Sequence, residues 1–173
     1  MRAFSLLALL TITLAGCVDQ DPVQPTSLLE PSFYNAGGGY WQVTKLDDTN
    51  DGTCDADCSL REAIAKAASG DEIRFGVTGT ITLTATLQIN KNLTITGPGA
   101  AQLRVSGHET YGVFAFGPNV TASLSRVTIA DGRAASGGGI FKGTGTLTLT
   151  DCVVSGNQAT SSGGGIYNAT GTL

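Results

Sequence analysis

Apolar and polar residues alternate in short runs over residues 73–173, which is the pattern of half-buried β-strands. In Ile73-Arg74-Phe75 and Thr80-Ile81-Thr82-Leu83, charged or hydroxyl side chains separate the apolar ones, and Gly97-Pro98-Gly99 is a typical turn. Further runs of this kind lie at residues 87–89, 93–96, 103–105, 113–116, 124–129, 140–141, 147–149 and 152–154. The pattern predicts a domain built from short strands.

These runs repeat with a period near 25 residues. Gly137-Gly138-Gly139-Ile140 recurs as Gly163-Gly164-Gly165-Ile166 at an offset of 26, whereas Leu124 matches Leu149 at an offset of 25. The difference indicates a one-residue insertion in a loop between the two halves of the repeat. Such a period, filled with Thr, Val, Leu, Ile and Gly, predicts a stacked solenoid.

We therefore expect an all-β fold, a right-handed parallel β-helix of about four coils over residues 73–173. Apolar side chains would stack inside, and Thr and Ser would face outward. Tight bends between the faces would place glycines where a positive φ or a close backbone approach is needed. The residues expected in these bends are Gly138, Gly139, Gly164 and Gly165. Asn157 is expected to bond the backbone in a turn.

The repeat stops in mid-coil at Leu173, which corresponds to Leu147. Because solenoids finish with capping units, we expect a chain truncated at its C-terminus. An uncovered last coil would expose a strand edge and apolar interior, which favours self-association through that end.

One helix is predicted, over residues 60–68. Ser59-Leu60-Arg61-Glu62 is a capping box, and Gly70 follows at the position of a C-terminal cap. A first strand is expected at residues 40–46, so residues 40–72 would form an N-terminal cap that covers the open end of the solenoid. Arg61 and Glu62 are expected to stabilise this cap and not to act in catalysis.

The first 17 residues have the features of an export signal. Arg2 precedes an apolar run, Phe4–Leu14, which is too short to span a bilayer. The following Leu14-Ala15-Gly16-Cys17 resembles a bacterial lipobox, which implies a lipid on Cys17 and attachment to a membrane. An ordinary cleaved secretory signal is the alternative. Residues 18–39, with three prolines, are expected to form a tether.

The expected localisation and the net charge limit the kinds of binding partner. Val18 stands where an inner-membrane lipoprotein would carry Asp, which favours the outer membrane or the cell surface. The net charge of −4 argues against a nucleic-acid partner. The membrane, polysaccharide and other cell-surface proteins remain as expected partners.

Export also affects the expected oxidation state of the cysteines. In an oxidising compartment Cys54 and Cys58, four residues apart, are expected to form a disulfide. Cys152 is left over, and its alignment with Val127 predicts an inert, buried thiol.

The acidic loop before the helix offers a candidate metal site. Its carboxylates could bind calcium, although Cys58 stands where a calcium loop has a bidentate glutamate. The alternative is a loop of Asx turns, and no other cofactor is expected. The candidate ligands are Asp47, Asp51, Asp55 and Asp57.

The segment from Thr53 to Ile64 contains Cys58-Ser59-Leu60-Arg61-Glu62-Ala63 and resembles the N-terminal module named after this string, the CSLREA module. The resemblance extends over roughly residues 41–107. It implies a bacterial exported protein in which a right-handed parallel β-helix of the pectin-lyase type follows the module, and it transfers no catalytic residue. The two Gly-Gly-x-Ile repeats are similar, more weakly, to those of polymorphic outer-membrane proteins, although Val154 replaces their usual Phe.

A catalytic site is not indicated. Glycoside hydrolysis needs two facing carboxyl groups, whereas Asp131 and Asp151 are 20 residues apart and would not stack at a 25-residue period. His108 and Glu109 fall in a predicted surface loop. The sequence therefore favours a structural or adhesive surface protein without catalysis in this span. The alternatives are a polysaccharide lyase or glycoside hydrolase of the β-helix type, and a calcium-dependent scaffold.

Overall fold

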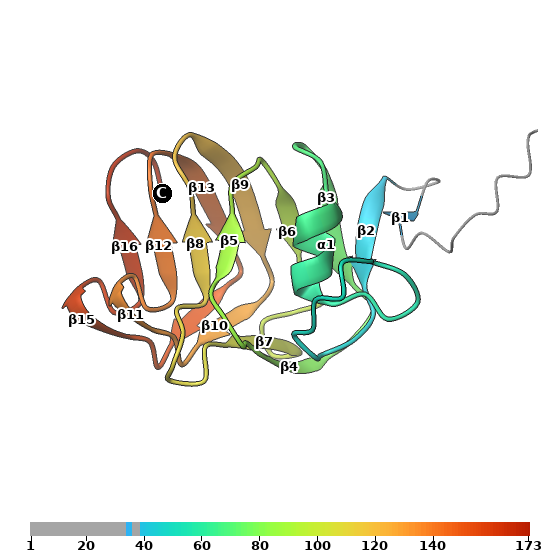
Figure 1. Cartoon of the computed structure of the whole chain (residues 1–173). Helices are drawn as coiled ribbons and strands as arrows, with labels where there is room; N and C mark the ends of the chain where they lie inside the picture. Colours follow the sequence, from blue (N-terminus) through green and yellow to red (C-terminus); the bar gives the residue numbers. More distant parts are fainter. Residues whose placement is uncertain (1–33, 36–38) are drawn as a thin grey trace, which may run out of the picture.

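The computed structural model describes residues 34–35 and 39–173 of the 173-residue chain. These residues form an all-β parallel solenoid with one short helix, as predicted (Figure 1). The predicted export signal, Cys17 and most of the predicted tether lie outside the described residues. Within the tether range, Tyr34–Asn35 forms a short strand, β1, which pairs antiparallel with β2.

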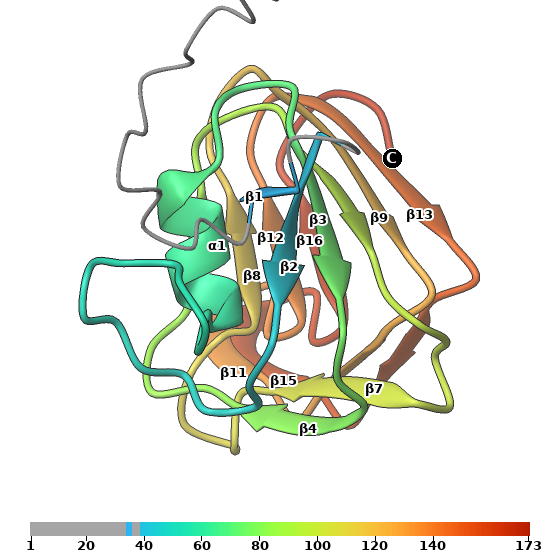
Figure 2. The same cartoon turned by 90° about the vertical axis from the view of Figure 1, so that its right-hand side faces the viewer.

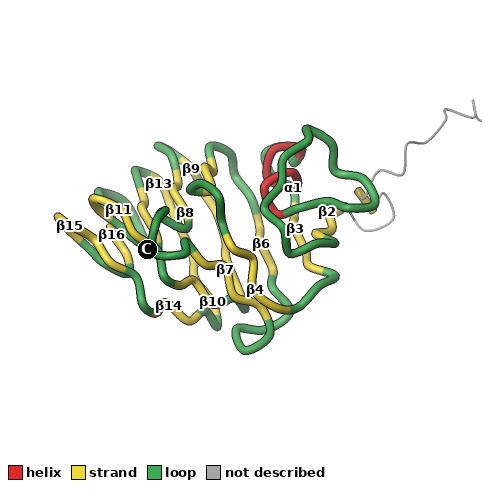
Figure 3. Tube along the Cα trace, turned by 60° about the horizontal axis from the view of Figure 1, so that its bottom comes forward, coloured by secondary structure: helices red, strands yellow, loops and turns green. Residues whose placement is uncertain are grey.

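Three faces of the solenoid are built from hydrogen-bonded strands of successive coils (Figures 1 and 3). The first sheet contains β1, β2 (Tyr40–Val43), β3 (Glu72–Phe75), β6 (Thr94–Thr96), β9 (Val120–Ser125) and β13 (Gly145–Thr150), in this order. The second contains β4 (Gly79–Thr82), β7 (Leu103–Ser106), β10 (Thr128–Ala130) and β14 (Val153–Ser155). The third contains β5 (Leu87–Ile89), β8 (Phe114–Phe116), β12 (Ile140–Lys142) and β16 (Ile166–Asn168). A small pair joins β11 (Arg133–Ser136) and β15 (Gln158–Ser162).

The core lies inside the coils, where equivalent side chains stack. Ile73, Ile95 and Leu124 are paired across the first sheet, and each is at most 2% exposed. The predicted pairing of Leu124 with Leu149 is also present. On β4, β6 and β9 apolar residues alternate with hydroxyl residues, and the apolar ones are buried while the hydroxyl ones are more exposed.

The one-residue insertion lies in a strand pair and not in a loop. Ala134 pairs with Ala159 at an offset of 25, whereas Ser136 pairs with Ser162 at an offset of 26. The register between β11 and β15 therefore shifts by one residue. A bulge of this kind accommodates an extra residue without interrupting the neighbouring sheets.

The helix α1 (Leu60–Lys66) lies at the N-terminal end of the stack, beside β2 (Figures 1 and 2). It ends two residues before the predicted Ala68, because Ala67 turns to ψ 140° and acts as the C-terminal cap in place of Gly70. The ammonium of Lys91 compensates for the early end by donating hydrogen bonds to the carbonyls of Ala65 and Ala67, at 3.2 and 2.6 Å. Leu60, Ala63 and Ile64 enter the core.

The glycine runs form the predicted bends, with the roles distributed differently. The positive φ falls on the first glycine of each run, 64° at Gly137 and 61° at Gly163. Gly138, Gly139 and Gly164 instead allow close backbone approach; a Cβ on Gly138 would lie 2.8 Å from the carbonyl oxygen of Gly164. Gly165 is the least crowded of the four predicted glycines, because a Cβ there would meet only a methyl of Val154, at 3.3 Å.

Candidate functional site

Buried polar side chains hold the loop before the helix against the first coils. Asp48 accepts hydrogen bonds from Nε and Nη2 of Arg61, at 3.0 and 2.7 Å, and from the backbone N–H of Thr84, at 2.7 Å. Arg61 also donates to the carbonyl of Ala85 at 2.5 Å. Since Asp48 is 7% exposed, this pair stabilises the attachment of the cap, which is the role expected of Arg61.

Glu62 has the equivalent role at the start of the helix. Its carboxylate accepts from the backbone N–H groups of Ser59, at 2.7 Å, and Asp51, at 3.0 Å, and lies 3.5 Å from the ammonium of Lys45. The reciprocal bond from the Glu62 N–H to Ser59 Oγ completes the predicted capping box. Burial lowers the pKa of Lys45, but its hydrogen bond to Asp57 and the charge of Glu62 outweigh this and raise the pKa overall.

The carboxylates predicted to bind calcium are not gathered around one point. Asp51 accepts two hydrogen bonds from Thr53, at 2.8 and 2.7 Å, which lower its pKa; Asp57 pairs with Lys45 at 3.1 Å, which lowers the pKa of that carboxyl also. Asp55 accepts from the backbone of Asp57, and Asp47 is exposed. Within residues 39–173, no three His, Cys, Asp or Glu side chains converge to hold a metal ion. The loop therefore has the geometry of hydrogen-bonded Asx turns.

The two cysteines of this loop are joined. Cys54 and Cys58 form the predicted disulfide, with their Cα atoms 4.3 Å apart. The third cysteine of the described residues, Cys152, is half-buried, whereas its equivalent Val127 is 1% exposed. The difference arises because Cys152 precedes β14, which pairs with β10 alone among the described strands, whereas Val127 precedes β10, which pairs with strands on both sides.

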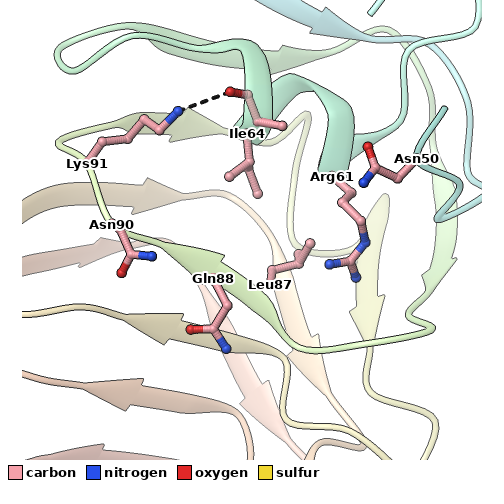
Figure 4. Close-up of a pocket in the computed structure, with 8 residues that line it drawn as sticks. Asn50, Arg61, Ile64, Leu87, Gln88, Asn90 and Lys91 are labelled. Atoms are coloured by element: carbon pink, nitrogen blue, oxygen red, sulfur yellow. Dashed lines mark hydrogen bonds between the residues drawn. The ribbon is translucent and has the colours of Figure 1, made fainter. Parts of the chain in front are cut away.

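A hollow of about 240 Å³ lies between α1 and β5 (Figure 4). Its floor is apolar, because Ile64 and Leu87 are 5% and 1% exposed. Three amides, Asn50, Gln88 and Asn90, surround it together with Arg61 and Lys91, and the lining contains no carboxylate. Figure 4 shows Gln88 and Asn90 side by side on the outer face of the strand, with Lys91 reaching toward the helix.

The polar groups of this hollow differ in whether they already form hydrogen bonds within the protein. Lys91 donates to the two carbonyls at the helix end, and Arg61 is engaged with Asp48. No hydrogen bond from another described residue reaches the side-chain amides of Gln88 and Asn90, both of which are exposed. These amides can both donate and accept, so they are free to bind a ligand that carries hydroxyl groups.

A second hollow, of about 420 Å³, is lined by His108, Glu109 and Asp131. All three residues have φ between 50° and 54°, in the left-handed region. The carboxylate of Asp131 is already bound by the guanidinium of Arg104 and by Ser106 Oγ, the latter at 3.2 Å. His108 and Glu109 lie in the predicted surface loop, and the structure brings them to Asp131.

Sequence reasoning missed Gln88 and Asn90 in the first hollow, and in the second it named His108, Glu109 and Asp131 without predicting that they meet. Gln88 and Asn90 alternate with Leu87 and Ile89, which predicts that they face outward but not that a helix lies beside them. Arg104 and Asp131 are 27 residues apart, close to the period, so their stacking in adjacent coils was accessible from the repeat. Asn157 was anticipated: its Oδ1 accepts from the N–H of Gly132 at 2.7 Å.

Among the described residues, no helix has the length and hydropathy needed to cross a membrane. Comparisons of the chain with protein-family models, curated proteins and solved structures found no match. The functional conclusion therefore depends on the geometry described above.

Proposed function

We propose that this chain is an exported, lipid-anchored protein of the bacterial cell envelope that binds surface polysaccharide without cleaving it. The observation that supports binding is the hollow beside α1, in which the unpaired amides of Gln88 and Asn90 project from a strand with an apolar floor. Sugar hydroxyls both donate and accept hydrogen bonds, as amides do. The absence of carboxylates from the lining favours binding over hydrolysis, which needs two carboxyl groups.

The export part of the proposal depends on residues 1–17 and on the resemblance of residues 53–64 to the CSLREA module. Cys17→Ser tests it in a bacterial host. We expect the unaltered protein in the membrane fraction, with acyl chains on Cys17 in mass spectra, and the variant released from that fraction. Equal distribution of both proteins would contradict the lipid anchor.

Affinity electrophoresis in gels with neutral polymers, such as soluble glucan and galactomannan, and acidic ones, such as pectate and alginate, tests the binding site. The Gln88→Ala/Asn90→Ala variant removes both amides, and we expect its affinity for the retained polymer to fall about tenfold, since each lost hydrogen bond contributes roughly 0.5–1.5 kcal/mol. Gln158→Ala is the matched control, because Gln158 is also an exposed strand amide but lies on β15. The site is refuted if no polymer retards the protein, or if the double variant migrates as the unaltered protein does.

A second candidate function has its own observation. His108 and Glu109, held beside Asp131 in the larger hollow, are an acid–base pair that a polysaccharide lyase or hydrolase could use. Incubation with the same polymers, followed by assay of reducing ends and unsaturated products, decides between the two. Product formation that Glu109→Gln abolishes would establish the enzyme and displace the non-catalytic proposal.

A further inference from the structure

Outward-facing hydroxyl groups form a regular array on the first sheet. In this sheet β6, β9 and β13 pair in parallel, which stacks Thr94 on Ser123 and Thr148, and Thr96 on Ser125 and Thr150. A third file consists of Thr121, Thr146 and Thr172. We name the eight residues on β6, β9 and β13 the hydroxyl face; they are Thr94, Thr96, Thr121, Ser123, Ser125, Thr146, Thr148 and Thr150.

The spacing of this face is fixed by the backbone. Neighbouring strands lie about 4.8 Å apart, and alternate residues of one strand lie about 6.6 Å apart, so the hydroxyl groups occupy a two-dimensional lattice with these repeats. The six consecutive pairs between β9 and β13 run from Val120–Gly145 to Ser125–Thr150 without a register shift. Behind the face, Ile95 and Leu124 are buried at 2% and 1% exposure, which holds the strands in place.

Most of these hydroxyls are not used by the protein. Thr96 donates to Glu72 at 3.1 Å, and Ser125 donates to the carbonyl of Ile95 at 3.5 Å. The other six hydroxyl groups have no hydrogen-bond partner within the described part of the chain. Their bonds must therefore be made with solvent or with a ligand.

The charge of the face restricts its partner. The files that begin with Thr94 and Thr96 are preceded in β3 by Glu72 and Arg74, which neutralise each other at 2.8 Å. From β6 to β13 every outward strand residue is an uncharged Thr or Ser, without an aromatic or Arg side chain such as protein interfaces favour. An uncharged partner that both donates and accepts hydrogen bonds on a regular lattice is the electrostatic complement.

We propose that the hydroxyl face binds ice. Water at an ice surface is uncharged, donates and accepts hydrogen bonds, and repeats in two dimensions with spacings close to those of the strands. The threonine methyl groups order first-shell water, and the adjacent hydroxyl groups bond to it, so that a patch of lattice-like water can merge with the crystal. The proposal is independent of polysaccharide binding at the hollow beside α1.

Ice recrystallisation in a frozen sucrose film tests the proposal. The 173-residue chain is expected to arrest grain growth at micromolar concentration. Ser123→Tyr places a bulky ring at the centre of the face, and we expect it to raise the concentration required about tenfold. Thr80→Tyr, on an exposed strand position of the second sheet, is the control and is expected to leave inhibition unchanged.

Circular dichroism and a cooperative melting transition establish that each variant is folded. If Ser123→Tyr does not fold, Thr148→Lys replaces it as the test variant, because Thr148 is exposed and lies in the same file. The proposal is overturned if grains grow as fast as with an unrelated protein of equal mass. Equal inhibition by Ser123→Tyr and the unaltered chain would also overturn it, as would binding of insoluble polysaccharide that Ser123→Tyr abolishes, which would assign the face to a carbohydrate.

Discussion

At the scale of single residues, buried and half-buried polar groups connect segments that are distant in the sequence. Asp48 binds Arg61 and Thr84, and Asn157 bridges to the previous coil through Gly132 and the carbonyl of Ile129. The ammonium of Lys142, which is 1% exposed, donates to three backbone carbonyls, of Gly143, Gly145 and Thr170, at 2.8–3.1 Å. Among the described residues no buried side-chain nitrogen or oxygen lacks a hydrogen-bond partner, so these contacts avoid the desolvation cost of an unpaired polar atom.

Glu62→Ala is predicted to destabilise the protein by about 3 kcal/mol or more. The change leaves the backbone N–H groups of Ser59 and Asp51 without their acceptor and removes a charged partner of Lys45, and hydrogen bonds to charged groups contribute about 1.5–3 kcal/mol each. Urea unfolding measures the loss. Glu109→Ala, at an exposed position, is expected to change stability by less than about 0.5 kcal/mol. Similar losses in both variants would contradict the structural role of Glu62.

Glu72 makes stability depend on pH. The hydrogen bond from Arg74 lowers its pKa, and a further bond from Thr96 adds to this against the opposing effect of burial. Because the folded-state pKa lies below the unfolded value of about 4.3, the stabilisation is present above that pH and is lost as the pH falls through the folded-state pKa. The side chain is 24% exposed, so the contribution is about 0.5–1 kcal/mol.

We therefore expect Glu72→Gln to reduce stability at pH 7 by that amount and to differ less from the unaltered protein as the pH falls below about 4. Urea unfolding of both proteins between pH 7 and pH 3 gives the difference directly. Asp51 and Asp57, whose pKa values are also lowered, are present in both proteins, so their contributions to the pH dependence cancel in the difference. A difference that stays constant with pH would show that Glu72 acts through packing and not through its charge.

At the scale of elements, the sequence predicted those features of a helix or strand that depend on neighbouring residues in the chain. The capping box and the apolar positions of residues 60–64 are sufficient to predict where α1 begins. The carbonyl of Ala67 at its end is bound by Lys91, which lies 24 residues further along the chain, so no local signal reports this end. For the same reason the outward direction of Gln88 follows from strand alternation, whereas the hollow beside it depends on where the helix docks. The sequence did not report that three of the four candidate calcium ligands, Asp51, Asp55 and Asp57, have partners within the loop and its surroundings, such as Thr53 for Asp51.

The disulfide is predicted to stabilise the cap rather than the whole solenoid. In the chain-entropy description, closing so short a loop raises the free energy of the unfolded chain by about 2 kcal/mol, because the chain loses conformational entropy. Cys54→Ser/Cys58→Ser should lower the protection of α1 amides in hydrogen exchange by a corresponding factor of about 30, while the amides of β9 and β10 keep theirs. Cys152→Ser, which removes a thiol that is not in a disulfide, is the control. Equal loss of protection in all strands would mean that the cap and the coils unfold as one unit.

At the scale of the whole molecule, the two ends of the solenoid differ. At the N-terminal end the helix and the loop before it cover the first coil, and Leu60 and Ile64 complete the core. At the other end β14, β15 and β16 each pair with one strand only among the described residues. Large apolar side chains are exposed there, with Val153 at 47% and Leu173 at 53%. Unpaired edges of this kind are templates for a further strand.

We predict that the 173-residue chain self-associates through this last coil, by pairing its open edge with that of a second copy. Sedimentation velocity over a range of concentrations should show a reversible increase in mass. Val153→Lys adds a charge to the edge strand, and like charges from two copies would face each other, so association should weaken markedly. Thr80→Lys is a matched control, since Thr80, Arg104, Thr128 and Val153 pair in one file, Thr80 lies at its opposite end, and Thr80 and Val153 are both exposed. If both lysine variants associate equally, or if the unaltered chain stays monomeric at high concentration, the edge is not the contact.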